Sequence, residues 1–151
     1  MRAFLPALTA TLGLLALAGP ASADVCGELI DRVTSETGAD LVKRSADFAE
    51  FRGADGIGMT LACGELSATG AQFRGAPLPA GYFDLLGRAG HAVTGIAADV
   101  LAQAGRTALT AAATTRHSNV DAGKVLVTCS LSGSREAPVT ACAVIERDER
   151  R

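Results

Sequence analysis

Apolar and polar side chains alternate along this chain with two different periods. Apolar residues recur at helical spacing over residues 25–37, 80–94 and 97–112, which predicts three amphipathic helices. Gly38 and Gly95 follow the first two segments and are expected to end those helices, because glycine readily adopts the left-handed conformation of a C-cap. The third segment is rich in alanine, which combines high helix propensity with little bulk.

The other segments favour β-strands. Residues 57–63 follow an Asp-Gly turn and alternate between larger apolar and small side chains, which is typical of a strand with one apolar face. Residues 65–76 are expected to return beside it as a further strand. Residues 124–132 and 139–147 predict a hairpin. Charges interrupt the pattern over residues 40–52, which we interpret as one polar strand at a sheet edge.

These elements follow one another in the order α-β-β-β-α-α-β-β, and the polar stretch over residues 114–123 is expected to be a loop. No repeat or low-complexity linker divides the chain. The pattern therefore predicts a single α+β domain, with an antiparallel sheet of about five strands and helices packed on one face. The order is similar to that of type III secretion chaperones, without a shared motif.

The N-terminal residues have the pattern of a secretory signal peptide. A positive start at Met1-Arg2 precedes an uncharged apolar run over residues 3–19, and Ala21-Ser22-Ala23 supplies the small residues that a signal peptidase recognises. The run contains proline and glycine and is short for a bilayer of roughly 30 Å, so a permanent membrane anchor is less favoured. Lipidation at Cys26 is also less favoured, because small residues do not precede it. We expect cleavage of residues 1–23.

Cleavage changes the composition on which function can be judged. The whole sequence has 151 residues and a net charge of -2, whereas residues 24–151 number 151 − 23 = 128 and carry 13 basic and 16 acidic groups, a net charge of -3. No basic block remains to neutralise phosphates, which argues against a nucleic-acid partner. The domain would be exported to the periplasm or secreted, without stable membrane insertion, and its charged tail over residues 147–151 is expected to fray.

Four cysteines remain after cleavage, at positions 26, 63, 129 and 142. An exported chain is expected to pair them in two disulfides, which would stabilise the domain. Their spacing lacks the close ligand pairs of zinc sites, so we predict no metal site. Four cysteines allow three pairings.

Two patterns in the predicted C-terminal hairpin favour different pairings. Direct opposition of Cys129 and Cys142 needs a strand register that sums to 271 and an even turn such as residues 134–137. A register that sums to 270 would place more apolar residues on one face and turn Cys142 away from it. We prefer the second register, which gives the pairs Cys63–Cys129 and Cys26–Cys142. The alternative pairs are Cys26–Cys63 and Cys129–Cys142.

Groups suited to catalysis are scarce. The chain has two histidines, His91 in a predicted helix without a partner and His117 in the predicted polar loop. His117 lies beside Ser118, but adjacent residues seldom face each other and no nucleophile elbow is present. Neither a phosphate-binding loop nor a Cys-x-x-Cys motif occurs. These features favour a protein that is not an enzyme, with no cofactor.

The sequence therefore favours an exported, disulfide-stabilised binding or structural protein, whose partner is another protein of the cell envelope or exterior. Its interaction surface would be the polar face around Lys43, Arg44 and Asp47, or the loop with Arg116 and His117. One alternative is a small exported hydrolase that uses His117 with a nearby carboxylate such as Asp121. Another is a chaperone-like protein or inhibitor with an apolar groove between helices and sheet.

Overall fold

The computed structural model describes residues 24–148, so the predicted signal peptide and residues 149–151 lie outside the described residues. The described chain forms three α-helices: α1 (Val25–Thr37), α2 (Tyr82–Thr94) and α3 (Ala98–Thr115). It also forms a short 3-10 helix, η1 (Ala54–Gly56), and seven strands: β1 (Asp40–Arg44), β2 (Phe48–Arg52), β3 (Gly58–Ala62), β4 (Ala68–Arg74), β5 (His117–Ala122), β6 (Val125–Gly133) and β7 (Pro138–Glu146).

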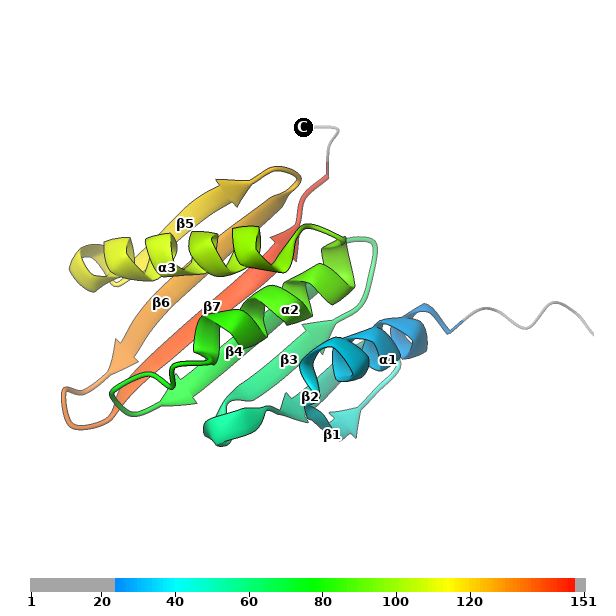
Figure 1. Cartoon of the computed structure of the whole chain (residues 1–151), viewed down its shortest axis with the longest axis horizontal. Helices are drawn as coiled ribbons and strands as arrows, with labels where there is room; N and C mark the ends of the chain where they lie inside the picture. Colours follow the sequence, from blue (N-terminus) through cyan, green and yellow to red (C-terminus); the bar gives the residue numbers. More distant parts are fainter. Residues whose placement is uncertain (1–23, 149–151) are drawn as a thin grey trace, which may run out of the picture.

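All seven strands join one antiparallel sheet in the order β1-β2-β3-β4-β7-β6-β5 (Figure 1). The last strand in the chain therefore lies in the middle of the sheet, next to β4. The predicted α+β domain with an antiparallel sheet and two disulfides is confirmed. The predicted count of about five strands is wrong, because the described residues contain seven.

Both additional strands lie at the edges of the sheet. Residues 40–52 form the hairpin β1–β2 rather than one strand, with a turn closed by the Ser45 N–H donating to the Phe48 carbonyl at 2.7 Å. The predicted loop over residues 114–123 contains the end of α3 and strand β5. Every residue of β1 is exposed, and β5 alternates between exposed and half-buried residues. Such edge strands are polar because little of their surface is buried, so their sequences lack a clear apolar alternation.

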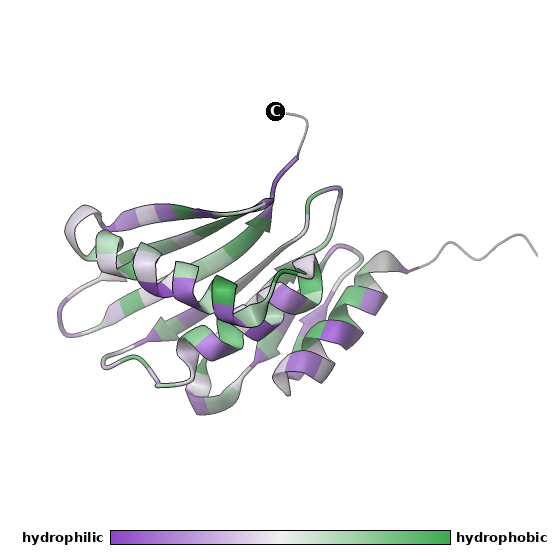
Figure 2. Cartoon of the chain, turned by 45° about the horizontal axis from the view of Figure 1, so that its top comes forward, coloured by the Kyte–Doolittle hydropathy of each residue, from purple (hydrophilic) through white to green (hydrophobic). Residues whose placement is uncertain are grey.

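The helices differ in what they cover. Helix α2 contacts β4 and β7, and α3 contacts β5, β6 and β7 (Figure 1). Helix α1 instead packs mainly beside α2, an arrangement that the sequence did not predict. Figure 2 shows that hydrophobic and hydrophilic residues alternate along α1, as expected for a helix with one buried side. Gly38 and Gly95 end α1 and α2 in left-handed conformations, with φ of 67° and 73°, which confirms both predicted C-caps.

Two glycines allow α2 to approach α3 and the sheet closely. A Cβ atom on Gly87 would overlap the backbone carbonyl of Ala98 at the start of α3. A Cβ atom on Gly90 would lie 2.7 Å from Leu101 of α3 and 3.0 Å from Val144 of β7. These glycines therefore serve helix packing.

The single tyrosine of the chain joins α2 to the centre of the sheet. The hydroxyl of Tyr82 donates to the carbonyl of Ala71 in β4 at 2.5 Å and accepts from the N–H of Cys142 in β7 at 3.1 Å. Ala71 and Cys142 are direct partners across these strands. Burial raises the pKa of Tyr82 well above its usual value, although the hydrogen bond from Cys142 acts in the opposite direction. The neutral hydroxyl thus forms part of the core.

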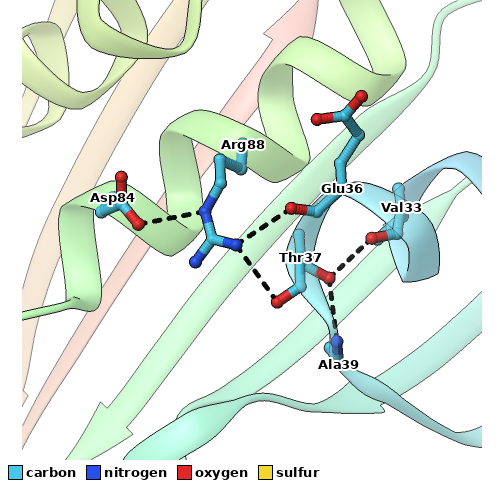
Figure 3. A network of polar contacts seen from close by, with 6 residues as sticks. All are labelled: Val33, Glu36, Thr37, Ala39, Asp84 and Arg88. Atoms are coloured by element: carbon cyan, nitrogen blue, oxygen red, sulfur yellow. Dashed lines mark hydrogen bonds and ion pairs between the residues drawn. The ribbon is translucent and has the colours of Figure 1, made fainter.

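A polar network joins the end of α1 to α2 (Figure 3). Arg88 donates to the carboxylate of Asp84 at 3.0 Å and to the backbone carbonyl of Glu36 at 3.0 Å. It also reaches the carbonyl of Thr37 at 3.4 Å, while the hydroxyl of Thr37 donates to the carbonyl of Val33 at 2.6 Å. The guanidinium therefore satisfies carbonyl groups that the end of α1 leaves without helical partners.

The disulfides join Cys26 to Cys63 and Cys129 to Cys142, so the preferred pairing of Cys63 with Cys129 and of Cys26 with Cys142 is wrong. The β6–β7 register places Cys129 directly opposite Cys142, which is the register that sums to 271. The side of β7 that faces the helices holds Thr140, Cys142 and Val144. The larger apolar set points to the other face of the sheet, where it is only half-buried; it consists of Val139, Ala141, Ala143 and Ile145.

Candidate functional site

The sheet has one face covered by α2 and α3 and a second face that these helices do not cover, which we call the open face. Alternation in β3 shows the distinction: Met59 and Leu61 are buried in the core, whereas Gly58, Thr60 and Ala62 are exposed. The same alternation runs through β2, β4, β6 and β7. An antiparallel sheet can expose one face to water. We therefore compare the side chains on the open face with those expected on a solvated surface.

A hollow of about 780 Å³ is lined by residues of all seven strands, from Val42 in β1 to His117 in β5. We call this hollow the trough. Strand register places its open-face side chains in two rows that cross the sheet. The first row consists of Glu50, Thr60, Gly70, Ala143 and Thr128. The second row consists of Arg52, Gly58, Gln72, Ala141, Ser130 and His117.

Ionisable side chains are confined to the ends of the two rows. Over the four central strands β3, β4, β7 and β6, both rows contain only glycine, alanine, serine, threonine and glutamine. Glu50 and Arg52 lie on β2 at one end, and His117 lies on β5 at the other. The middle of the trough is therefore uncharged and, apart from Gln72, bordered by small side chains.

Several polar side chains of the trough lack partners within the described chain. Glu50, Arg52, Gln72 and Ser130 form no side-chain hydrogen bond or ion pair with residues 24–148. The imidazole Nε2 of His117 lies 2.9 Å from the hydroxyl of Thr128. The trough thus offers carboxylate, guanidinium, amide and hydroxyl groups that can bond to an external molecule.

A third row of open-face side chains runs beside the trough and is apolar. Phe48, Ala62, Ala68, Ile145 and Leu126 are register partners across β2, β3, β4, β7 and β6. Phe48, Ile145 and Leu126 are only half-buried. The open face therefore combines a row of accessible hydrocarbon with the polar groups of the trough.

The structure does not bring the predicted interaction residues into one patch. Lys43 and Arg44 lie on β1 and Asp47 in the turn before β2, whereas Arg116 and His117 lie at β5, on the opposite edge of the sheet. Of these five residues, His117 lines the trough.

Arg44 and Asp47 have local partners instead. Arg44 forms an ion pair of 2.7 Å with Asp24, whose carboxylate also caps α1 by accepting from the Gly27 N–H at 2.9 Å. The hydrogen bond from Gly27 and the contact with Arg44 lower the pKa of Asp24. Asp47 accepts a hydrogen bond of 3.0 Å from the hydroxyl of Ser45.

The predicted pairing of His117 with Asp121 is not formed. Both lie on the exposed side of β5, four residues apart, which corresponds to roughly 13 Å along a strand. Asp121 forms an ion pair with Arg147 instead. The imidazole Nδ1 of His91 lies 2.9 Å from the carbonyl oxygen of Ile96. Ile96 follows the end of α2, so this contact stabilises the connection to α3.

Sequence reasoning missed the central residues of the trough, including Thr60, Gln72, Thr128 and Ser130. Each occupies the polar side of an alternating strand, a position that usually faces water. They belong to one site only because β7 pairs with β4 and β6 pairs with the other edge of β7. One sequence feature could have indicated the site: the polar positions of these alternating strands contain few charged residues.

Residues 24–148 contain no group of three or more His, Cys, Asp or Glu side chains placed to hold a metal ion. All four cysteines are in disulfides. None of the described helices is long and apolar enough to cross a membrane. No protein-family model matches the sequence, and no significantly similar curated protein or solved structure was found.

Proposed function

We propose that this chain is an exported, disulfide-stabilised binding protein that holds another protein of the cell envelope or exterior on the open face of its sheet. The proposal rests on the open face itself. A sheet face in water usually carries charged side chains, whereas the two rows of the trough contain only uncharged residues over the four central strands. The row beside them contains half-buried Phe48, Ile145 and Leu126. A concave, largely uncharged surface with a few polar groups is typical of a binding site.

The two disulfides support an oxidising environment. Disulfides persist mainly in exported proteins, and this pairing secures both α1 and the centre of the sheet. The leader pattern at residues 1–23 is consistent with such a location.

A binding role accounts for the site better than hydrolysis does. His117 lies next to a hydroxyl group, and the carboxylate of Asp121 is occupied by Arg147. A general base needs a partner that orients it, and none of the described carboxylates does so. The proposed groove between helices and sheet is also less suitable, because the core side chains of β3, β6 and β7 fill that side.

Two serines on the open face of β6 provide a matched test. Ser130 lines the trough, whereas Ser132 lies two residues further along the same side of the strand and outside it. Side chains stand roughly perpendicular to a sheet, so Ser130→Tyr should fill the trough and Ser132→Tyr should leave it open. Both variants should keep the circular dichroism spectrum and thermal midpoint of the parent.

The experiment is chemical cross-linking of the tagged protein in its own cell envelope, followed by mass spectrometry. We expect the parent chain to be cross-linked to a stoichiometric protein partner. Ser132→Tyr should retain this partner, whereas Ser130→Tyr should lose it. Recovery of the same proteins with all three chains, or of none with the parent chain, would contradict a partner site in the trough.

A further inference from the structure

We infer that the trough binds an extended, uncharged polypeptide segment of about eight residues. The inference rests on the proposed binding function and names the chemistry of the partner's contacting segment. It is carried by three properties of the trough: its shape, its charge and the chemical groups that line it.

The shape favours an extended chain over a helix. The trough extends from β1 to β5 across six strand spacings, which correspond to roughly 29 Å. Its two rows of side chains lie two residues apart along each strand, which corresponds to roughly 7 Å. A helix with side chains is about 10 to 12 Å wide and so is wider than the space between the rows.

An extended chain fits between the rows. It is roughly 4.8 Å wide in the hydrogen-bonding direction, which is less than the separation of the two rows. A length of roughly 29 Å at about 3.3 Å per residue corresponds to eight or nine residues. The occupant would therefore lie across the strands rather than add a strand at an edge.

The charge distribution specifies the middle of the segment. A charged side chain placed over Thr60, Gln72, Ala141 or Thr128 would lose water without meeting an opposite charge, and such burial is costly. Glu50 and Arg52 occur together at the β2 end, so a charge of either sign can be accommodated there. We therefore expect uncharged residues at the centre of the segment and tolerance of charge at one end.

The lining groups favour a peptide over a glycan. The amide of Gln72 and the hydroxyl of Ser130 have no partner within residues 24–148 and can bond to peptide N–H and C=O groups. The phenyl ring among the residues that line the trough belongs to Phe51, which is 3% exposed and part of the core, so within the trough it offers no ring face on which a sugar could stack. The apolar row beside the trough can receive the side chains of the segment.

Selection from a phage-displayed library of random eight-residue peptides tests the inference. The baits are the purified oxidised parent protein, Ser130→Tyr and Ser132→Tyr. Gly58→Gln is a second blocking variant, because a Cβ atom at Gly58 would lie no closer than 3.8 Å to its neighbours. We expect enriched peptides on the parent and on Ser132→Tyr, with Asp, Glu, Lys and Arg depleted from the central positions.

A selected peptide is then synthesised, labelled and measured by fluorescence anisotropy. Its Kd should rise by roughly tenfold or more on Ser130→Tyr, on Gly58→Gln, and on the parent when lysine replaces its central residue. The inference would be overturned if no peptides were selected, or if both blocking variants bound the selected peptides as well as the parent does. A charge-rich consensus, or binding of a glycan array in place of peptides, would also overturn it. If cross-linking still identifies a partner that Ser130→Tyr loses, the binding function stands and only the peptide chemistry is wrong.

Discussion

Removal of the Tyr82 hydroxyl is the most direct test of how the sheet and α2 are held together. Tyr82→Phe keeps the ring, which is 0% exposed, and deletes the group that bonds to both Ala71 and Cys142. Ala71 and Cys142 are each 3% exposed, so water cannot readily replace the lost bonds. The substitution therefore removes a hydrogen-bond partner from one carbonyl and one N–H in the centre of the sheet.

The expected cost follows from these two groups. A buried donor or acceptor left without a partner costs about 1 to 3 kcal/mol. The phenylalanine ring no longer buries a hydroxyl, which offsets part of that cost. We expect the free energy of unfolding to fall by about 2 to 4 kcal/mol, a large share of the roughly 5 to 15 kcal/mol typical of a domain.

Urea unfolding followed by far-ultraviolet circular dichroism measures this loss, with the transition midpoint shifting at an unchanged slope. Thr110→Val is the matched control, because the Thr110 hydroxyl is exposed and bonds within α3 to the carbonyl of Arg106. The control should change stability by less than about 0.5 kcal/mol. An equally small effect of Tyr82→Phe would refute the assignment of two essential hydrogen bonds to the hydroxyl.

The same residue predicts a dependence on alkaline pH. Because burial raises the folded-state pKa of Tyr82 above its usual value of 10.0, its contribution is complete below that pH. At higher pH the unfolded chain releases the phenolic proton first, so the free energy of unfolding falls as pH rises toward the folded-state pKa. Tyr82 is the sole tyrosine, so tyrosinate absorbance reports it alone. Ionisation at the usual pKa without unfolding would contradict its burial.

Three further predictions concern packing and covalent structure. Gly87→Ala should lower the free energy of unfolding by about 1 to 3 kcal/mol in urea titrations, because its Cβ would overlap the backbone of α3. Gly64→Ala, with no neighbour closer than 3.8 Å, should be nearly neutral. Arg88→Ala should lower the free energy of unfolding by about 1 kcal/mol and increase hydrogen exchange at the end of α1, because two carbonyls lose their hydrogen-bond donor. Unchanged hydrogen exchange would contradict this role of Arg88. Non-reducing peptide mapping should recover α1–β3 and β6–β7 cross-links, and any other pairing would contradict the structure.

Local patterns predicted the elements that have a buried side. Residues 25–37 form α1 with the predicted bounds, and the other two helices differ from prediction by a few residues. Buried helices and central strands must present one apolar side to the core, so their period is visible in the sequence. The edge strands β1 and β5 lack this constraint because they bury little side-chain surface, and the sequence pattern therefore missed both as separate strands.

The disulfides show how a local pattern can mislead. Apolar residues in β7 favoured a register in which Ala141 and Ala143 face the core, but they lie on the open face. Thr140 occupies the core face and is 4% exposed. Small side chains distinguish the two faces weakly, so the parity of the turn at residues 134–137 was the better guide to register.

By itself, the sequence determined the helices, their glycine caps, the alternating central strands and the expectation of two disulfides, because each depends on neighbours close in the chain. Only the tertiary structure decided that β7 lies beside β4, which brings Gln72, Ala141 and Ser130 into one row. Gln72 is far in the sequence from the hairpin that carries Ser130 and Ala141, and it shares no local motif with that hairpin. The trough exists because strand order, set by packing of the whole domain, aligns their uncharged sides.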